Sequence, residues 1–401
     1  MLGAIIGDII GSPYEFDINN IKTTEFPLFG KNTEFTDDTI MTIAVAEGLM
    51  NGYGDREKTK TEIVKSMQTL GRKYPNAGYG INFNRWLHND KPEPYNSYGN
   101  GSAMRVSSVA WLYNNIRDIE EFAETSAQVT HNHPEGIKGA KATAVAIFLA
   151  RQGADKDYIR KYIEDKYQYY LNRTCNEIRI YYHHVESCQE TVPEAITAFL
   201  EGNSFEETIR LAVSLGGDSD TLTAIAGSIA EAFYPIPEEL RIKAVSMLDD
   251  ELKSILHRYR KFLKEVREKH YKQFDKLMSN IAFFDKGGKV AWHALPPEGN
   301  VYHFAHPCYG NEVFAIEEFA QSKDFADFEY SKTIENFGLR MDLDLYKEKA
   351  DSCSPLALRA MLTSLVRQER FCDGLIASAI EKGTISAILK SYKKQMKPQI
   401  L

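Results

Sequence analysis

The stretch Gly216-Gly217-Asp218-Ser219-Asp220-Thr221 stands directly before an apolar run, residues 222–233, that has helical spacing. Two carboxylates two residues apart therefore lie at the N-terminus of a predicted helix, where free backbone N–H groups and the helix dipole favour negative charge. Two such acids repel each other unless a proton or a metal ion lies between them, and hard divalent ions prefer oxygen ligands. The stretch therefore indicates either a helix cap or a carboxylate metal site.

A similar arrangement lies far upstream, where Thr36-Asp37-Asp38-Thr39 precedes the apolar run 40–50. Asp, Ser and Thr are ordinary N-cap residues, so either motif alone is more often a cap than a site. If the two helix N-termini face each other, four carboxylates and several hydroxyl groups converge. The pair of motifs therefore favours an oxygen-only site for one or two magnesium-like ions.

Composition sets the broad class of the protein. The chain has 401 residues, of which 43% are hydrophobic and 26% charged, as is typical of a globular protein with two domains. The net charge of −8 argues against general nucleic-acid binding, which needs a basic surface. No run reaches the ~18 apolar residues of a membrane span, and the five cysteines are scattered without a CxxC motif. We therefore expect a cytoplasmic protein without signal peptide, membrane segment or disulfide framework.

A segment rich in Gly, Asn and Ser, residues 95–105, leads into a helix predicted over 106–113. Backbone N–H groups of such a loop can close on the oxygens of a diphosphate, although this is neither a Walker loop nor a dinucleotide fingerprint. Arg105 could bind phosphate or pair with a buried carboxylate. His131 and His133 precede a helix predicted over 137–150, but imidazole is not the usual ligand at a hard-oxygen site.

Glycines four residues apart begin the chain at Gly3, Gly7 and Gly11, and they suit close packing of a second helix or a ligand. Residues 17–35 are loop-like and could act as a lid beside the site. We place the domain boundary near residue 265, within a continuous helix predicted over 238–278. Further helices are predicted over 59–72, 81–87, 120–130, 155–170, 192–200 and 204–214.

Residues 266–401 change in character and suggest a smaller α+β domain. Short apolar runs at 281–284 and 301–305 are compatible with strands, and helices are predicted over 315–322, 355–370, 373–381 and 384–391. Packing and surface ion pairs are the expected roles of its polar residues. Weaker alternatives are a metal site of His303, His306 and Cys308 and a charged site of Arg367, Glu369 and Arg370.

The order of these motifs resembles the ADP-ribosylglycohydrolase family, which includes the dinitrogenase reductase-activating glycohydrolases. Thr-Asp-Asp-Thr near the N-terminus and Gly-Gly-Asp-Ser-Asp-Thr late in an all-helical stretch carry the resemblance, which covers residues 1 to about 260. It implies an all-α fold, a compact orthogonal multi-helix catalytic domain over 1–265. The remainder, 266–401, resembles a small uncharacterised domain family of bacterial proteins, which supplies no activity.

The same resemblance implies roles for individual residues. Glu15 matches a family Glu beside the metals, and Glu15 and Asp38 are the residues expected to transfer protons or position water. Asp220 is the expected bridging ligand. The implied metal ligands are Thr36, Asp37, Asp38, Asp218, Asp220 and Thr221, and the implied ADP-ribose contacts are Ser97, Tyr98, Gly99, Asn100, Gly101, Ser102 and His131.

We therefore expect a hydrolase with two Mg²⁺ ions, or Mn²⁺ in their place, that cleaves the glycosidic bond between ADP-ribose and a modified acceptor. Such a reaction passes through an oxocarbenium-like centre, and a metal can orient ribose hydroxyls and activate a water. The acceptor could be a protein side chain (arginine or serine), a nucleic-acid base or a small molecule. Two alternatives stay open: a silent ADP-ribose-binding or structural protein, and a hydrolase of another phosphorylated nucleoside or ADP-ribose conjugate, such as an acyl ester.

Overall fold

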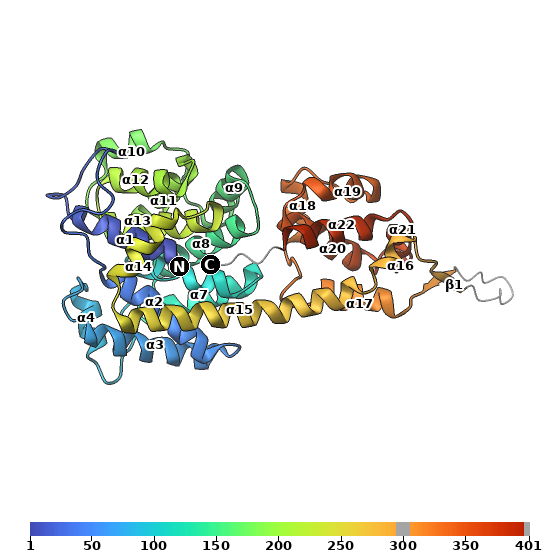
Figure 1. Cartoon of the computed structure of the whole chain (residues 1–401), viewed down its shortest axis with the longest axis horizontal. Helices are drawn as coiled ribbons and strands as arrows, with labels where there is room; N and C mark the ends of the chain where they lie inside the picture. The colour runs from blue at the N-terminus through green and yellow to red at the C-terminus, as the bar shows by residue number, and fades with distance from the viewer. Residues whose placement is uncertain (294–304, 397–401) are drawn as a thin grey trace. The chain divides into compact units, whose positions relative to one another are not determined.

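The computed structural model describes residues 1–293 and 305–396, and the chain falls into two units (Figure 1). Unit 1 comprises residues 1–151 and 155–263, and unit 2 comprises residues 152–154 and 264–401. The regular elements of unit 1 are all helices, whereas the described part of unit 2 adds one two-stranded sheet. The predicted all-α fold of the N-terminal part is confirmed.

The glycine face of α1 (Leu2–Gly11) decides how unit 1 is assembled, because it lets this helix lie directly on α13 (Ser219–Phe233). A Cβ atom on Gly7 would lie 2.1 Å from the carbonyl oxygen of Thr223, and one on Gly11 would lie 2.5 Å from that of Ser219. The backbones therefore touch, which favours the helix-packing interpretation of these glycines over a ligand. The end of α1 meets the start of α13, where the acidic motif lies.

The other helices of unit 1 surround this pair. The helix α8 (Pro134–Arg151) is buried along most of its length, as its aliphatic and alanine-rich sequence predicts. The remaining elements are η1 (Ser12–Tyr14), α2 (Asp37–Gly52), α3 (Arg56–Lys73), α4 (Ile81–Leu87), α5 (Gly101–Met104), α6 (Ser107–Leu112), α7 (Ile116–Gln128), α9 (Lys156–Tyr167), α11 (Cys188–Glu201) and α12 (Phe205–Leu215).

Two features of this region differ from the sequence-based prediction. The continuous helix predicted over 238–278 is wrong, because Leu248 is extended and separates α14 (Glu238–Met247) from α15 (Asp250–Met278). Asp249 then caps the second helix by accepting from the N–H of Leu252 at 2.9 Å. A further helix, α10 (Cys175–Tyr181), was not predicted, although Thr174 and Glu177 form a capping box at its start.

Unit 2 has a helical core with an aromatic cluster, in which the ring of Phe325 lies 4.5 Å from that of Phe319 and 5.2 Å from that of Tyr392. The strand predicted at 281–284 is wrong, because these residues form α16 (Ile281–Asp285). The sheet instead pairs β1 (Ala291–His293) with β2 (His306–Cys308), antiparallel. The other elements are α17 (Asn311–Ala320), α18 (Tyr330–Asn336), α19 (Leu343–Lys349), η2 (Ala350–Ser352), α20 (Pro355–Gln368), α21 (Leu375–Glu381) and α22 (Thr384–Gln395).

Residues 301–304 of the second predicted strand lie outside the described residues. Across the described ranges, no helix has both the length and the apolar character that a bilayer crossing requires. All five cysteines are free thiols.

Candidate active site

The start of α2 is capped from two sides, and neither cap is an acid of its own first turn. The hydroxyl of Thr36 accepts from the N–H of Asp38 at 3.3 Å. The carboxylate of Asp8, on α1, accepts from the N–H groups of Thr36 and Thr39, both at 3.0 Å, and from the Thr36 hydroxyl at 2.7 Å. The side chains of Asp37 and Asp38 are therefore free of the capping role that was the main alternative for this motif.

Asp8 was not among the predicted site residues. Its signal in the sequence is an acid inside an apolar run, on a helix that is buried along nearly its whole length. A buried carboxylate needs donors, and here they come from a helix N-terminus 28 residues further along the chain.

The start of α13 shows the same separation of roles. Asp218 occupies the N-cap position but makes no side-chain cap bond, and its carboxylate accepts instead from the side-chain amide of Asn100 at 2.7 Å. Asp220 accepts from the N–H of Thr221 at 2.9 Å and from the Thr36 hydroxyl at 3.4 Å. The hydroxyl of Thr221 donates to Asp38 at 3.2 Å, so the two helix N-termini face each other.

We call five of the acidic side chains at this site the acid cluster: Glu15, Asp37, Asp38, Asp218 and Asp220. Glu15 follows η1, and it places a carboxylate oxygen within 4.8 Å of oxygens of Asp218 and Asp220. The second carboxylate oxygen of Asp38, Oδ1, is buried and has no hydrogen-bond partner. A buried carboxylate oxygen without a donor is the arrangement that a cation would complete.

The pKa values of the cluster are shifted upward. Burial, followed by repulsion from Asp220, raises the pKa of Glu15 to about 8. Burial raises the pKa of Asp218 to about 6. Burial and then the neighbouring acids raise the pKa values of Asp37, Asp38 and Asp220 well above the ordinary range. Burial and mutual repulsion disfavour several negative charges held close together, so the acids tend to keep their protons. A divalent cation would therefore bind in competition with protons.

The glycine pair before Asp218 is held by the loop 17–35. Gly216 and Gly217 both have φ of +76°, which favours glycine, and a Cβ atom on Gly217 would lie 2.4 Å from the ring of Tyr182. Asn20 accepts from the N–H of Gly217 at 2.5 Å and donates to its carbonyl oxygen at 3.0 Å. The ammonium group of Lys22 donates to the carbonyl oxygen of Leu215 at 2.5 Å. These contacts fix the turn that presents Asp218 and Asp220.

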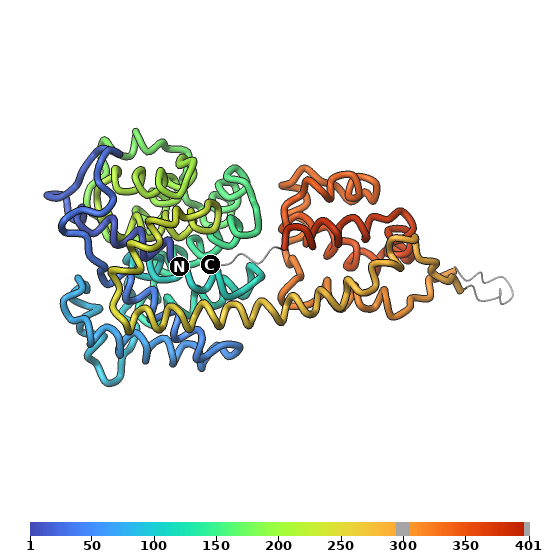
Figure 2. The backbone as a smooth tube through the Cα atoms, in the orientation of Figure 1, coloured from blue at the N-terminus to red at the C-terminus, as the bar shows by residue number. Residues whose placement is uncertain are grey.

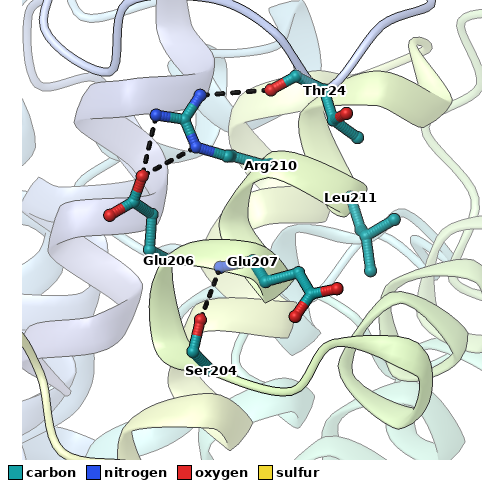
Figure 3. Close-up of a pocket in the computed structure, with 6 residues that line it drawn as sticks. All are labelled: Thr24, Ser204, Glu206, Glu207, Arg210 and Leu211. Carbon is teal, nitrogen blue, oxygen red and sulfur yellow. Dashed lines mark hydrogen bonds and ion pairs between the residues drawn. The ribbon is translucent and has the colours of Figure 1, made fainter.

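The same loop, dark blue in Figure 2, is also fixed in its middle by a residue of α12. Arg210 donates to the carbonyl oxygen of Thr24 at 3.1 Å and pairs with Glu206 (Figure 3). It also donates to the carbonyl oxygen of Phe26 at 2.8 Å. These anchors hold the segment that the sequence suggested as a lid. A cavity of about 360 Å³ beside Arg210 contains no predicted site residue, and it is lined by Thr24, Ser204, Glu206, Glu207, Arg210 and Leu211 (Figure 3).

The predicted ADP-ribose loop lies beside residues 186–188. The N–H of Asn100 donates to the carbonyl oxygen of Glu186 at 2.7 Å, and Gly99 forms a bridge with Ser187. Three of the predicted contact residues use their side chains internally. Asn100 donates to Asp218, the Ser102 hydroxyl donates to the carbonyl oxygen of Gly136 at 2.7 Å, and the Ser97 hydroxyl accepts from the N–H of Gly99 at 3.1 Å. The Tyr98 side chain is half-exposed.

His131 lies against this loop, and its Nε2 atom is 3.4 Å from the positions that Cβ atoms on Gly99 and Gly101 would take. The sequence left open whether Arg105 binds phosphate or pairs with a carboxylate. The structure instead shows its guanidinium group donating to the carbonyl oxygen of Ser126 at 3.1 Å and to the Thr130 hydroxyl at 2.8 Å. The ring of His133 lies 5.4 Å from that of Tyr98.

The weaker candidates in unit 2 have structural explanations or remain separate from one another. Glu369 accepts from the N–H groups of Gly374 and Ile376 and therefore caps the start of α21. The rings of His293 and His306 are 5.6 Å apart across the two strands, and His303 lies outside the described residues. Among the described residues, the one group of three or more His, Cys, Asp or Glu side chains close enough to hold a metal is Glu15, Asp218 and Asp220.

Comparison with known proteins gives the family. Residues 272–398 match a family of unknown function (DUF6508). Human ADP-ribosylhydrolase ARH3 is 27% identical over 307 residues, which cover 58% of this chain and 84% of that protein. The ADP-ribosylarginine hydrolase Tri1 of Pseudomonas putida is 26% identical over 266 residues, or 59% of this chain and 70% of that protein.

One solved structure that is similar is an ADP-ribosylglycohydrolase-related protein complex. It has a TM-score of 0.48 and 23% identity and covers 66% of this chain and 96% of that chain. The match that decides the family extends over residues 1–272, more than half of the chain. The chain therefore belongs to the ADP-ribosylglycohydrolase family, and it is a hydrolase that acts on ADP-ribosyl linkages.

Proposed function

We propose that the acid cluster holds two Mg²⁺ ions, or Mn²⁺ in their place, and that the protein cleaves the glycosidic bond between ADP-ribose and a modified acceptor. The observation that carries the proposal is the buried, unpartnered Oδ1 atom of Asp38, a carboxyl group whose pKa is raised by burial and then by its acidic neighbours on α1, α2 and α13. Such an oxygen costs free energy unless a donor or a cation lies beside it.

The chemistry of the donors supports a hard cation. The cluster offers carboxylates and the hydroxyl groups of Thr36 and Thr221, and these oxygen ligands suit Mg²⁺ and Mn²⁺ rather than zinc. The proposed ligands are Thr36, Asp37, Asp38, Asp218, Asp220 and Thr221, with Asp220 between the two helix N-termini.

When bound, the ions would orient the ribose hydroxyls and lower the pKa of a water molecule. The chain's own residues then hold the rest of the substrate. Gly99 and Gly101 carry no side chain, so a diphosphate could approach the backbone of this turn closely. Glu15 has a pKa raised to about 8 by burial and by Asp220, which suits a group that accepts and returns a proton near neutral pH. We assign Glu15 and Asp38 to proton transfer or water positioning.

The proposed partner is an ADP-ribosylated protein or a small-molecule ADP-ribose conjugate. The relative from Pseudomonas putida is an ADP-ribosylarginine hydrolase, which supports arginine as the first acceptor to test. The proposed compartment is the cytoplasm, in keeping with five free cysteines.

The test is release of ADP-ribose from a panel of arginine-, serine- and base-linked conjugates and an acyl ester, with Mg²⁺ or with chelator. The Asp218→Ala/Asp220→Ala variant is the control for an intact fold without the cluster. Metal-dependent release from one linkage would support the proposal and identify the acceptor. Tight ADP-ribose binding with no release would favour the alternative of a silent ADP-ribose-binding protein. An unaltered rate in the variant would overturn the metal site.

A further inference from the structure

We infer that Arg105 and Thr130 are positioning residues that hold His131 as the neutral Nε2–H tautomer, so that the ring donates a hydrogen bond over the Gly99–Gly101 turn. The inference rests on the proposed function for the identity of the ligand. The tautomer itself follows from contacts within the protein.

The chain of contacts begins at Arg105, which is 1% exposed. A guanidinium group has donors and no acceptor, so its 2.8 Å contact to the Thr130 hydroxyl uses that oxygen as the acceptor. The hydroxyl hydrogen of Thr130 must then find another partner. Within the described part of the chain, the second partner of this hydroxyl is Nδ1 of His131, at 2.7 Å.

Thr130 therefore donates to Nδ1, which must carry a lone pair, and the proton of the neutral ring lies on Nε2. The opposite tautomer would donate from Nδ1 to the Thr130 oxygen and leave the hydroxyl hydrogen without an acceptor. Thr130 is fully buried, where an unpaired donor is disfavoured. A doubly protonated ring would have the same defect, and burial and the nearby Arg105 also lower the pKa of His131 well below its ordinary value.

The position of Nε2 places this N–H group where it can donate to a bound ligand. The atom lies 3.4 Å from the positions that Cβ atoms on Gly99 and Gly101 would take, so it lies against the two glycines of the loop. An Nε2–H group there provides a donor at a place where the N–H groups of Gly99 and Asn100 are already bonded to Ser97 and Glu186. The site suits an oxygen acceptor, such as a phosphate or ribose oxygen of ADP-ribose. The neutral ring can donate to this oxygen without placing a second positive charge close to that of Arg105.

The direct test is the tautomer of His131 in the full-length, ligand-free protein labelled with ¹⁵N histidine. Two-bond ¹H–¹⁵N correlation spectra distinguish Nε2–H from Nδ1–H rings, and His131→Gln identifies the signal. We expect Nε2–H in the unmodified protein. Thr130→Val keeps the volume and removes the hydroxyl, so it should release the tautomer toward Nδ1–H or a mixture, and Thr130→Ser should restore it.

The second readout is binding of ADP-ribose by calorimetry, together with KM and kcat where turnover is measurable. We expect Thr130→Val to weaken ADP-ribose binding and raise KM about tenfold with kcat within twofold, and Thr130→Ser to recover both. An Nδ1–H ring in the unmodified protein, or an unchanged tautomer in Thr130→Val, overturns the inference. The spectrum decides this even if no conjugate is hydrolysed, so failure of the proposed function is seen separately.

Discussion

The helices α13 and α21 both begin beside an acidic side chain, yet the two acids do different work. Glu369 accepts from the N–H groups of Gly374 at 2.8 Å and Ile376 at 2.7 Å, and from the hydroxyl of Tyr309 at 2.5 Å. Its oxygens are fully used in stabilising the start of α21. Asp218 occupies the N-cap of α13 and makes no cap bond with its side chain.

The difference distinguishes an acid that caps a helix (a capping acid) from an acid that belongs to the acid cluster (a site acid). At the starts of α2 and α13, other residues provide the stabilising hydrogen bonds: Asp8 accepts from the free N–H groups of α2, and Asn100 donates to Asp218. Asp38 is left with a buried oxygen that has no donor. An acid at a helix N-terminus is therefore evidence of a site when its capping role is filled from elsewhere and its neighbours are also acids.

The sharpest way to break this comparison is to neutralise one acid of each kind. We expect Asp220→Asn to lower kcat at saturating Mg²⁺ by about 10³-fold or more, since it removes the negative charge of a proposed metal ligand that lies between the two helix N-termini. The stability of its metal-free form should be unchanged or higher, because repulsion within the cluster falls. Steady-state kinetics and chemical denaturation measure the two effects.

Glu369→Gln is the matched control and should behave in the opposite way. It weakens charge-assisted hydrogen bonds to two backbone donors, so unit 2 should lose about 1–3 kcal/mol of stability while kcat is unchanged. Loss of stability in both variants, with no loss of turnover in Asp220→Asn, would show that the two acids do the same work.

The second way concerns the cation itself. We expect Mg²⁺ to raise the melting temperature of the metal-free protein, with a gain of about 2.7 kcal/mol at a concentration one hundred times Kd. The physical reason is that the ion relieves repulsion among acids whose pKa values burial has raised. Asp218→Ala/Asp220→Ala should show no such gain, and Glu369→Gln should show the full one. Equal gains in all three proteins would place the ion elsewhere.

The sequence predicted the helices that carry the acidic motifs, because their apolar spacing and N-terminal residues are local signals. The predictions failed where a contact links distant parts of the chain. Asp8 and Asn20 looked like an interruption of an apolar run and a residue of an irregular loop. Their importance comes from backbone groups of Thr36 and Gly217, respectively 28 and 197 residues away.

The prediction for unit 2 shows another physical limit. The run 281–284 is apolar throughout and only four residues long, and such a run fits a buried strand or one face of a short helix equally well. Tertiary packing favours the helix, because Phe284 is fully buried within the helical core of unit 2. Likewise, the charge of Glu369 was visible in the sequence, but the N–H groups that it caps were not.

A third experiment asks how far the site acids depend on their supports. Asn20→Ala removes both hydrogen bonds to Gly217, so the turn before Asp218 and Asp220 should become less well fixed. We expect Mg²⁺ affinity to fall about tenfold, as is typical when a residue that orients metal ligands is lost. Calorimetric titration with Mg²⁺ measures this. Arg210→Lys, which alters the anchor of the same loop at Thr24 and Phe26, is the control and should change affinity less.

The smallest effect expected is a dependence of stability on pH in the absence of metal. The pKa of Glu15 is raised to about 8, first by burial and then by Asp220, so the folded protein keeps a proton that the unfolded chain has already lost. Stability should therefore fall as pH rises from about 4.5, the ordinary pKa of a Glu side chain, to about 8, by about 1 kcal/mol since Glu15 is partly exposed, and then level off. Denaturation with guanidinium across this range measures the slope. Glu15→Gln should reduce the slope, because Asp37, Asp38 and Asp220 also have raised pKa values, and excess Mg²⁺ should remove it, whereas Glu369→Gln should leave it in place. An undiminished slope in excess Mg²⁺ would mean that groups outside the acid cluster dominate the titration, and the contrast between site acids and capping acids would then lose its electrostatic basis.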